Sequence, residues 1–254
     1  MVDLKKITIN NKALYLAYDQ GLEHGPTDFN DKNVDPLYII NIAKKSKFNA
    51  LIFQKGIAEK YYKEIKKSKI PLIIKLNGRT NLVKGDPISN QICSVDQAIK
   101  LGAVAVGYTI YIGSIHESEM FEDFQKIQEQ AHKKNMPVIL WIYPRGKFIK
   151  KKSKKQLMAY AARTGLELGA DIIKIKYEGN IKDLNWAVKS AGKTKVVIAG
   201  GIKKSEKHFL KQVKEIMDAG CIGLAVGRNV WQAKDPIAIS DKIKKIIYKE
   251  SLKK

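Results

Sequence analysis

Eight short, apolar segments of strand-forming residues recur along this chain, and their repetition limits the fold more than any other feature of the sequence. They occupy residues 13–19, 50–56, 72–78, 103–110, 138–144, 171–177, 196–201 and 222–227. Their first residues lie 22 to 37 positions apart, and almost every gap holds a segment with helical character. Strands that alternate with helices in this way predict βαβ units and a parallel sheet.

Cap residues mark the boundaries of several expected helices. Gly102, Gly169 and Gly220 each stand between a helical pattern and the next strand, where a left-handed C-cap residue belongs. Ser94, followed by Gln97, has the spacing of a capping box and indicates a helix start. The order helix end, glycine, strand therefore repeats along the chain, as a barrel requires.

Eight such units in 254 residues match the size of a (β/α)8 barrel, in which functional side chains collect at the C-terminal ends of the strands. We therefore expect an α/β protein, a single-domain (β/α)8 TIM barrel over residues 1–254. A doubly wound open sheet is the alternative. It is less favoured because no GxGxxG motif follows the first strand.

The composition is that of an ordinary globular protein, since 44% of the residues are hydrophobic. The apolar runs are far shorter than the roughly 18 residues that indicate a membrane span, and the N-terminus lacks the apolar region of a signal peptide. We expect a cytoplasmic protein with no membrane partner.

Cysteine and histidine do not form the close spacings typical of zinc sites, so no metal is expected. Cys93 and Cys221 are expected to be buried thiols, because disulfides are rare in a reducing compartment. The histidines are scattered: His24, His116, His132 and His208.

The formal net charge of +22 favours anionic partners, which could be nucleic acid, a membrane surface or phosphorylated metabolites. The densest basic run, 147–155, has one aromatic residue and no arginine, a poor match to surfaces that read or stack bases. We expect it to be a solvated loop that leads into a helix, and we expect no specific nucleic-acid binding.

Two lysines lie within the apolar segment 171–177. Because side chains alternate along a strand, Lys174 and Lys176 share one face. Burial and a neighbouring like charge both disfavour an ammonium ion, and a neutral lysine attacks carbonyl carbon. An exposed edge strand would also explain the two lysines, but a closed barrel has no edge. The spacing does not separate Lys174 from Lys176 as the nucleophile.

Other polar and aromatic residues lie near the ends of the expected strands. Asp19 follows the first strand, and Trp141 and Tyr143 lie on the fifth. Taken singly, Asp19 reads as a turn or cap residue and the two aromatic residues as core. Their shared position at the C-terminal strand ends makes them candidates for the site.

The seventh and eighth strands end in glycines. Gly200 and Gly201 alone would read as a turn, but Gly227 and Arg228 follow at the end of the next strand. In barrels these two loops commonly bind phosphate, since glycine admits close approach to backbone N–H groups and arginine adds charge-assisted hydrogen bonds. The sequence therefore predicts a phosphate site here.

Four segments together resemble the archaeal-type class I fructose-1,6-bisphosphate aldolases, the branch shared with DhnA-like bacterial enzymes. The resemblance covers nearly the whole chain. The segments, which occur in the family's order, are AYDQGLEHGP at 17–26, WIYPRG at 141–146, KIKY at 174–177 and GLAVGRNVW at 223–231.

The resemblance implies a role for each matching residue. Lys174 would form the Schiff base, Tyr143 would donate and accept protons, and Asp19 would orient the substrate hydroxyls and assist proton movement. Lys176, Arg228 and exclusion of water would lower the pKa of Lys174. The substrate-binding set would be Gln20, His24, Trp141, Arg145, Lys176, Ala199, Gly200, Gly201, Gly227 and Arg228.

The implied activity is reversible cleavage of fructose 1,6-bisphosphate to dihydroxyacetone phosphate and glyceraldehyde 3-phosphate, in glycolysis and gluconeogenesis. It needs no cofactor or metal, because the intermediate is an imine on lysine. The resemblance also implies a homo-oligomer, a decamer built from pentamers.

The chain departs from the family pattern at two positions. Ala199 stands where many relatives have serine, which removes a hydroxyl contact to phosphate. Lys147 stands where a second glycine often follows Arg-Gly, which alters the loop after the fifth strand. Neither change involves the expected lysine, tyrosine and aspartate.

Two other functions compete with this interpretation. The nearer is a Schiff-base synthase on the same barrel that transfers a carbon fragment in archaeal aromatic amino-acid precursor synthesis. The more remote is a basic nucleic-acid-binding protein on an inactive barrel, for which binding would fall steeply with salt.

Overall fold

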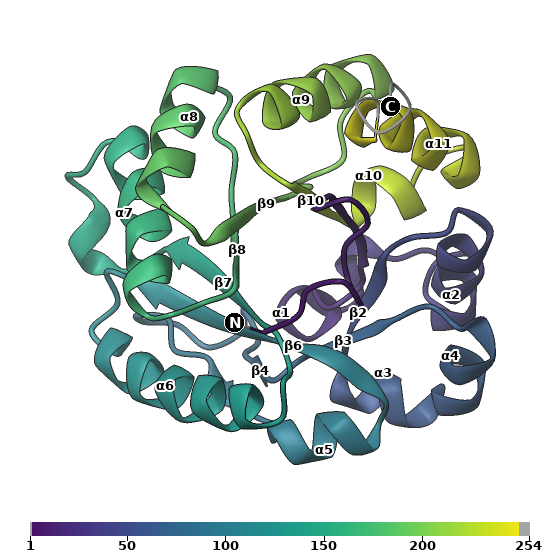
Figure 1. Cartoon of the computed structure of the whole chain (residues 1–254), viewed down its shortest axis with the longest axis horizontal. Coiled ribbons are helices and arrows are strands. Elements are labelled where there is room, and N and C mark those ends of the chain that lie inside the picture. Colours follow the sequence, from purple (N-terminus) through teal and green to yellow (C-terminus); the bar gives the residue numbers. More distant parts are fainter. Residues whose placement is uncertain (1, 249–254) are drawn as a thin grey trace.

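A computed structural model describes residues 2–248 of the chain as a closed barrel of parallel strands surrounded by helices (Figure 1). The strand order around the barrel is β1-β10-β9-β8-β7-β6-β3-β2, and every neighbouring pair is parallel. The expected (β/α)8 barrel is confirmed and the open sheet is wrong. The predicted domain, 1–254, extends at both ends beyond the described residues.

Each predicted segment overlaps one barrel strand, although β6 ends two residues after its segment and β9 begins one residue before its segment. The strands are β1 (Ala13–Ala17), β2 (Ala50–Gln54), β3 (Leu72–Lys75), β6 (Ala103–Ile112), β7 (Val138–Pro144), β8 (Ile172–Ile175), β9 (Lys195–Ala199) and β10 (Gly223–Val226). Most predicted segments run past the C-terminal end of their strand, because the residues that follow form the rim of the barrel.

One predicted strand, 72–78, is wrong beyond Lys75. The chain leaves the barrel there, and β4 (Asn77–Gly78) pairs antiparallel with β5 (Asn90–Gln91) in a separate two-stranded sheet. The buried Asn77 holds this excursion in place, because its side-chain amide donates to the carbonyls of Ser89 and Thr109 and accepts from the Thr109 N–H.

The helices are α1 (Gly21–His24), α2 (Pro36–Lys45), α3 (Lys55–Lys60), α4 (Tyr62–Ser68), α5 (Val95–Lys100), α6 (Glu117–Lys133), α7 (Lys154–Glu167), α8 (Ile181–Ser190), α9 (Glu206–Asp218), α10 (Arg228–Trp231) and α11 (Pro236–Ile247), with 3-10 turns at Gly25–Asp28 and Lys147–Ile149. Helices α2 to α11 surround the barrel in chain order, whereas the short α1 lies within the outline of the barrel in Figure 1.

The predicted helix boundaries are confirmed. Gly102, Gly169 and Gly220 have positive φ angles of 82°, 76° and 88°, as left-handed C-caps do. The Ser94 hydroxyl accepts from the N–H of Gln97 at the start of α5. The basic run 147–155 is a largely exposed loop that leads into α7.

Two layers of buried side chains form the core, because successive strand residues point to opposite faces. Leu14 and Leu16 pack outward against the helices, whereas Tyr15 and Ala17 point into the barrel. Ile7, from the N-terminal segment that crosses the barrel in Figure 1, packs on the inner layer. The inner layer forms the floor beneath the C-terminal rim.

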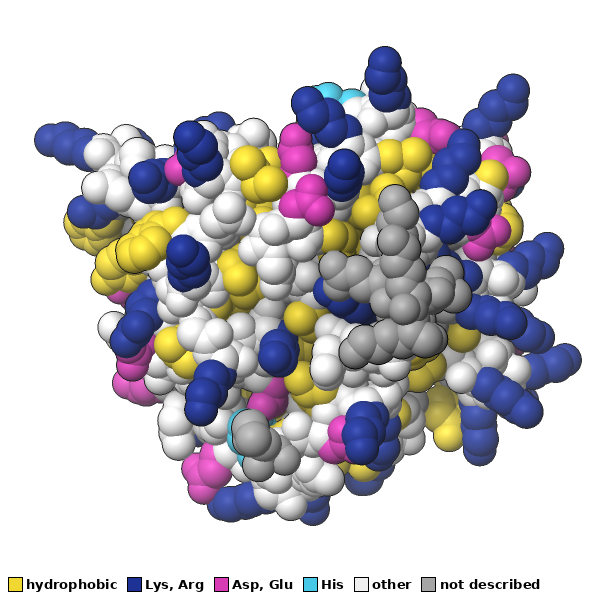
Figure 2. Space-filling view, turned by 45° about the horizontal axis from the view of Figure 1, so that its top comes forward, with side chains coloured by type: hydrophobic (Ala, Val, Ile, Leu, Met, Phe, Trp, Pro, Cys, Tyr) yellow, Lys and Arg dark blue, Asp and Glu magenta, His cyan; other side chains and the backbone are white. Residues whose placement is uncertain are grey.

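Cys93 and Cys221 are buried free thiols, as expected. No helix within residues 2–248 combines the length and the apolarity needed to cross a bilayer. On the face in Figure 2, Lys and Arg side chains occur over much of the surface, with acidic and apolar side chains between many of them, and they are densest at its right side.

Trp141 fills the inner layer directly below the rim, and Gly107 makes room for it. A Cβ atom on Gly107 of the neighbouring strand β6 would lie 1.8 Å from Cζ3 of the Trp141 ring. No atom can approach so closely, so the indole occupies this position only because residue 107 has no side chain.

The substitution Gly107→Ala is therefore expected to destabilise the fold by about 1–3 kcal/mol, because it displaces the buried indole. Chemical denaturation followed by tryptophan fluorescence measures this loss. Gly56→Ala is the matched control, since a Cβ there meets nothing within 4 Å and alanine favours helix α3. Adding Trp141→Phe to Gly107→Ala should restore part of the stability. Equal stability of Gly107→Ala and wild type would contradict this account.

Candidate active site

A cavity opens at the C-terminal ends of the barrel strands, and every site residue expected from the sequence lines it. Strands β1, β3, β7, β8, β9 and β10 contribute to its wall. Residues not expected from the sequence also line it: Ala17, Glu23, Lys75 and Ala225.

Lys174, on β8, lies at the bottom of this cavity. Its side chain is buried, and its Nζ lies 4.8 Å from the centre of the Trp141 ring. Burial, reinforced by Lys75, lowers the pKa of Lys174 to about 8, although Asp19 and Glu23 act in the opposite direction. At pH 7 about one molecule in ten then carries the neutral amine, against roughly one in 10³ for an ordinary lysine.

Asp19 and Lys75 form a buried ion pair beside Lys174. The Lys75 Nζ lies 3.7 Å from Asp19 Oδ2, and both side chains are almost inaccessible. Burial alone would raise the pKa of Asp19, but Lys174, Lys75 and a backbone hydrogen bond outweigh it and hold the pKa below the ordinary value. Asp19 is therefore an anion within the site.

The expectation that Lys176 and Arg228 lower the pKa of Lys174 is wrong, because the neighbouring cation that does so is Lys75. Lys176 follows the end of β8 and is exposed, with its Nζ 5.6 Å from the centre of the Tyr143 ring. The sequence did offer one signal for Lys75, because this lysine stands at the C-terminal end of an apolar strand segment, where site residues are expected.

Tyr143, on β7, borders the cavity between Lys176 and Arg145. Burial, together with the negative charges of Asp19 and Glu23, raises the pKa of Tyr143 well above its ordinary value. The phenol therefore retains its proton at neutral pH and can donate it. Its conjugate base, once formed, is a strong proton acceptor.

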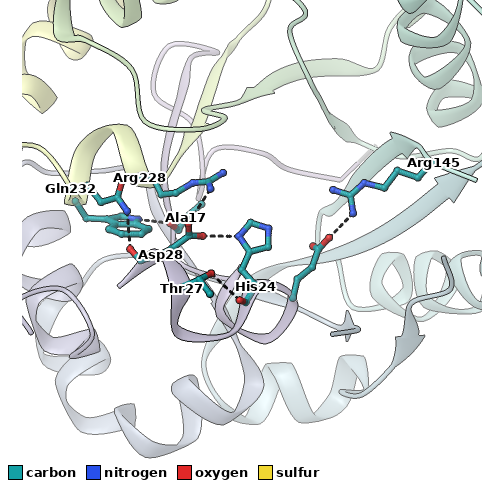
Figure 3. Close-up of polar contacts among 9 residues, drawn as sticks. Ala17, His24, Thr27, Asp28, Arg145, Arg228 and Gln232 are labelled. Atoms are coloured by element: carbon teal, nitrogen blue, oxygen red, sulfur yellow. Dashed lines mark hydrogen bonds and ion pairs between the residues drawn. The ribbon is translucent and has the colours of Figure 1, made fainter. Parts of the chain in front are cut away.

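Ion pairs hold the two arginines of the rim, as Figure 3 shows. Arg145 pairs with Glu23 and lies 5.2 Å from the centre of the Tyr111 ring. Arg228 donates to Asp28 at 3.1 Å, and the same carboxylate contacts Nδ1 of His24 at 2.6 Å.

Backbone atoms form the opposite side of the cavity, where β9 and β10 end. A Cβ on Gly227 would lie 2.8 Å from the Ala17 carbonyl oxygen, and one on Gly200 would lie 3.0 Å from Val226 Cα. Gly201 has a φ of 71°, which favours glycine. These positions have no room for a side chain, so the main chain is bare beside Arg228. An anion can therefore approach the backbone closely there.

Histidine, cysteine, aspartate and glutamate form no cluster of three or more suited to holding a metal ion within residues 2–248. The site chemistry described above rests on amine, carboxylate, phenol and backbone groups.

The chain resembles known aldolases in sequence. Residues 13–233 match the model of the DeoC/LacD family of aldolases. A class 1 fructose-bisphosphate aldolase of Thermoproteus tenax is 49% identical over 93% of this chain and 90% of its own length. A Methanocaldococcus jannaschii protein described as fructose-bisphosphate aldolase/6-deoxy-5-ketofructose 1-phosphate synthase is 37% identical, over 91% of this chain and 78% of its own length.

The fold agrees with solved aldolase structures. A Schiff-base-forming fructose-1,6-bisphosphate aldolase superimposes with a TM-score of 0.91 at 46% identity, over 96% of this chain and 98% of the other. An archaeal aldolase whose catalytic lysine carries the carbinolamine intermediate gives the same TM-score, identity and coverage. This chain belongs to the DeoC/LacD aldolase family and, within it, to the class 1 fructose-bisphosphate aldolases.

Proposed function

We propose that this chain reversibly cleaves fructose 1,6-bisphosphate to dihydroxyacetone phosphate and glyceraldehyde 3-phosphate through an imine on Lys174. The observation that carries the proposal is the buried Lys174 amine, with a pKa of about 8, in a cavity shared with Tyr143 and Asp19. The names of the relatives support the same reaction.

The two phosphates of the substrate are assigned to opposite sides of the cavity. The phosphate next to the reacting carbonyl binds at Gly200, Gly201, Gly227 and Arg228, where the backbone is accessible. The other phosphate extends toward the rim cations Arg145 and Lys176. Both regions offer charge-assisted hydrogen bonds, which are the strong kind.

In the first stage, the neutral Lys174 amine attacks C2 of the open-chain ketose, and one N–H proton moves to the C2 oxygen. The resulting carbinolamine loses its hydroxyl as water when Tyr143 supplies a proton, which leaves an iminium ion and a tyrosinate. The iminium is an electron sink, so it prepares the adjacent C3–C4 bond for cleavage.

In the second stage, the Tyr143 phenolate takes the proton of the C4 hydroxyl while the C3–C4 bond breaks. Its electrons pass to the iminium, giving an enamine and free glyceraldehyde 3-phosphate. Tyr143 returns the proton to C3 and becomes a phenolate again. Water then hydrolyses the new iminium, which releases dihydroxyacetone phosphate and the neutral Lys174 amine, and the proton set free restores the Tyr143 phenol. Asp19, kept ionised by its cationic neighbours, orients the substrate hydroxyls and assists these proton transfers.

We further propose that the protein acts in the cytoplasm, in glycolysis and gluconeogenesis, as one domain over 1–254 without a metal or cofactor. We propose that it assembles as a decamer built from pentamers. The phosphorylated sugar is its partner. We propose no specific nucleic-acid partner, because the densest basic run, 147–155, has one aromatic residue and no arginine.

A second candidate is a Schiff-base synthase that joins a carbon fragment to another acceptor, as in archaeal aromatic-precursor synthesis. The Methanocaldococcus jannaschii relative, whose name includes both an aldolase and a synthase activity, supports this second candidate. Both reactions would use the same imine, so only the products distinguish them.

Borohydride reduction in the presence of fructose 1,6-bisphosphate is expected to modify Lys174, because it traps the imine. Peptide mapping by mass spectrometry identifies the modified residue, and a triose phosphate assay separates aldolase from synthase. Lys174→Ala should abolish cleavage and leave the fold intact. An adduct only on Lys176, or no adduct at all, would refute the assignment.

Tyr143→Phe is expected to lower kcat by roughly 10²–10⁴, because it removes the group that donates and accepts protons. Steady-state kinetics of cleavage measure this change. Tyr160→Phe is a matched control, since Tyr160 is exposed on α7 and does not line the cavity. A variant with wild-type kcat would show that another group transfers the proton.

The rate of imine formation should rise about tenfold per pH unit below pH 8 and level off above it, because only the neutral amine reacts. In Lys75→Met the profile should move to higher pH by roughly one unit, since the cation is lost and Asp19 then favours the ammonium form of Lys174. Stopped borohydride trapping across pH measures the profile.

Two controls test whether the charge at position 75 causes the shift. Lys75→Arg keeps the charge and should retain the wild-type profile, and Lys176→Met should leave the position of the profile unchanged. If the pH profile of imine formation moved in Lys176→Met and stayed fixed in Lys75→Met, then Lys176, and not Lys75, would be the cation that lowers the pKa of Lys174.

A further inference from the structure

Asn229, the second residue of α10, lies beneath the loop that follows β9. Its buried side chain makes three hydrogen bonds to that loop. The amide nitrogen donates to the carbonyls of Gly200 and Ile202, both at 2.8 Å, and the amide oxygen accepts from the Lys204 N–H at 2.9 Å. One side chain therefore binds three points of a five-residue segment.

We propose that Asn229 is a positioning residue, which fixes the backbone at 200–204 for binding the phosphate adjacent to the imine carbon. This inference rests on the proposed function, because it concerns the phosphate end of the same cavity. Asn229 itself does not line the cavity, so it acts through the loop.

Two contacts outside Asn229 hold the ends of this loop, and one of them is the Lys204 Nζ, which donates to the Gln212 side chain of α9 at 2.8 Å. Gly201, Ile202 and Lys203 are exposed. The N–H of Gly200 is bound to the Ala225 carbonyl at 3.0 Å, so the sheet holds only the start of the segment. The Asn229 contacts extend that restraint across the turn at Gly201, which lines the cavity and has a positive φ of 71°.

The chemistry of these contacts requires asparagine. The site needs two donors and one acceptor at the end of a short side chain, and only the asparagine amide supplies that set. Aspartate has the same shape but no donor, so the oxygen in place of the amide nitrogen would face the carbonyl oxygens of Gly200 and Ile202. The carbonyls of Gly200 and Ile202 would then lose their hydrogen bonds and remain unsatisfied. Because an unsatisfied buried polar group is costly, the loop would move away from residue 229.

The α10 helix links this anchor to the other half of the phosphate site. Gly227 and Arg228 immediately precede Asn229, and Arg228 is held by Asp28 at the rim. The fixed geometry of α10 therefore relates the 200–204 backbone to Arg228. A phosphate meets both groups already in place, which reduces the entropy lost on binding.

The experiment compares two ketones that form the same imine. Dihydroxyacetone phosphate carries the phosphate, and dihydroxyacetone lacks it. For each, borohydride labelling of Lys174 gives the concentration at half-maximal labelling. In Asn229→Asp and Asn229→Ala this concentration should rise roughly tenfold or more for dihydroxyacetone phosphate and stay within about twofold for dihydroxyacetone, since only the phosphate uses the loop.

Asn77→Ala is the matched control. Asn77 is also buried and also makes two donated hydrogen bonds and one accepted bond to backbone, but on the β4 side of the barrel and outside the cavity lining. Its loss of thermal stability should resemble that of Asn229→Ala. The ratio of the two half-maximal concentrations should remain that of wild type.

A third variant keeps the test decisive if the Asn229 variants do not fold. Gly201→Ala strains the same loop at its positive φ, while its Cβ meets no atom within 4 Å, so it should give the same phosphate-selective loss. Folded Asn229 variants, or Gly201→Ala, with wild-type labelling by dihydroxyacetone phosphate would overturn the inference, as would equal losses for both ketones. Absence of labelling in wild type would instead refute the proposed function.

Discussion

The desolvation of the Lys174 amine is the constraint on which the rest of the site depends. A buried ammonium is costly, so the barrel interior shifts this lysine toward its neutral form. The neighbouring Asp19 alone would restore the ammonium, but Lys75 pairs with that carboxylate at 3.7 Å. The positive charge of Lys75 offsets the attraction of Asp19 for the ammonium form of Lys174. The site can therefore hold an anionic carboxylate and a neutral amine side by side.

The barrel determines which atoms can meet at this point. Strand alternation directs apolar side chains inward below the rim, and the large Trp141 indole closes the interior beneath Lys174. That indole fits only against the bare backbone of Gly107. The environment that lowers the pKa of the nucleophile thus depends on a glycine on β6, two strands away from β8.

The alternation of strands and helices was predictable because each strand carries its own apolar pattern, and the rim residues followed from their place at strand ends. Lys75 was not predictable as the partner of Asp19, because β2 separates their strands and only the closed register brings them together. The same holds for Asn229, whose contacts join α10 to the loop after β9. Local patterns predict elements, whereas contacts between loops depend on how the barrel closes.

The negative charge of the carboxylates at the rim opposes binding of a bisphosphate. Glu23 and Asp28 pair with Arg145 and Arg228, and each pairing weakens the local positive potential. Yet a long basic side chain loses conformational freedom when it binds phosphate, and a carboxylate that already holds the guanidinium removes much of that loss. A chain of net charge +22 already attracts an anionic substrate over a distance. Binding therefore gains more from fixed positions of the rim cations than from additional positive charge. The ion pairs at the rim thus lower the local positive electrostatic potential, but they orient the guanidinium groups before the substrate binds.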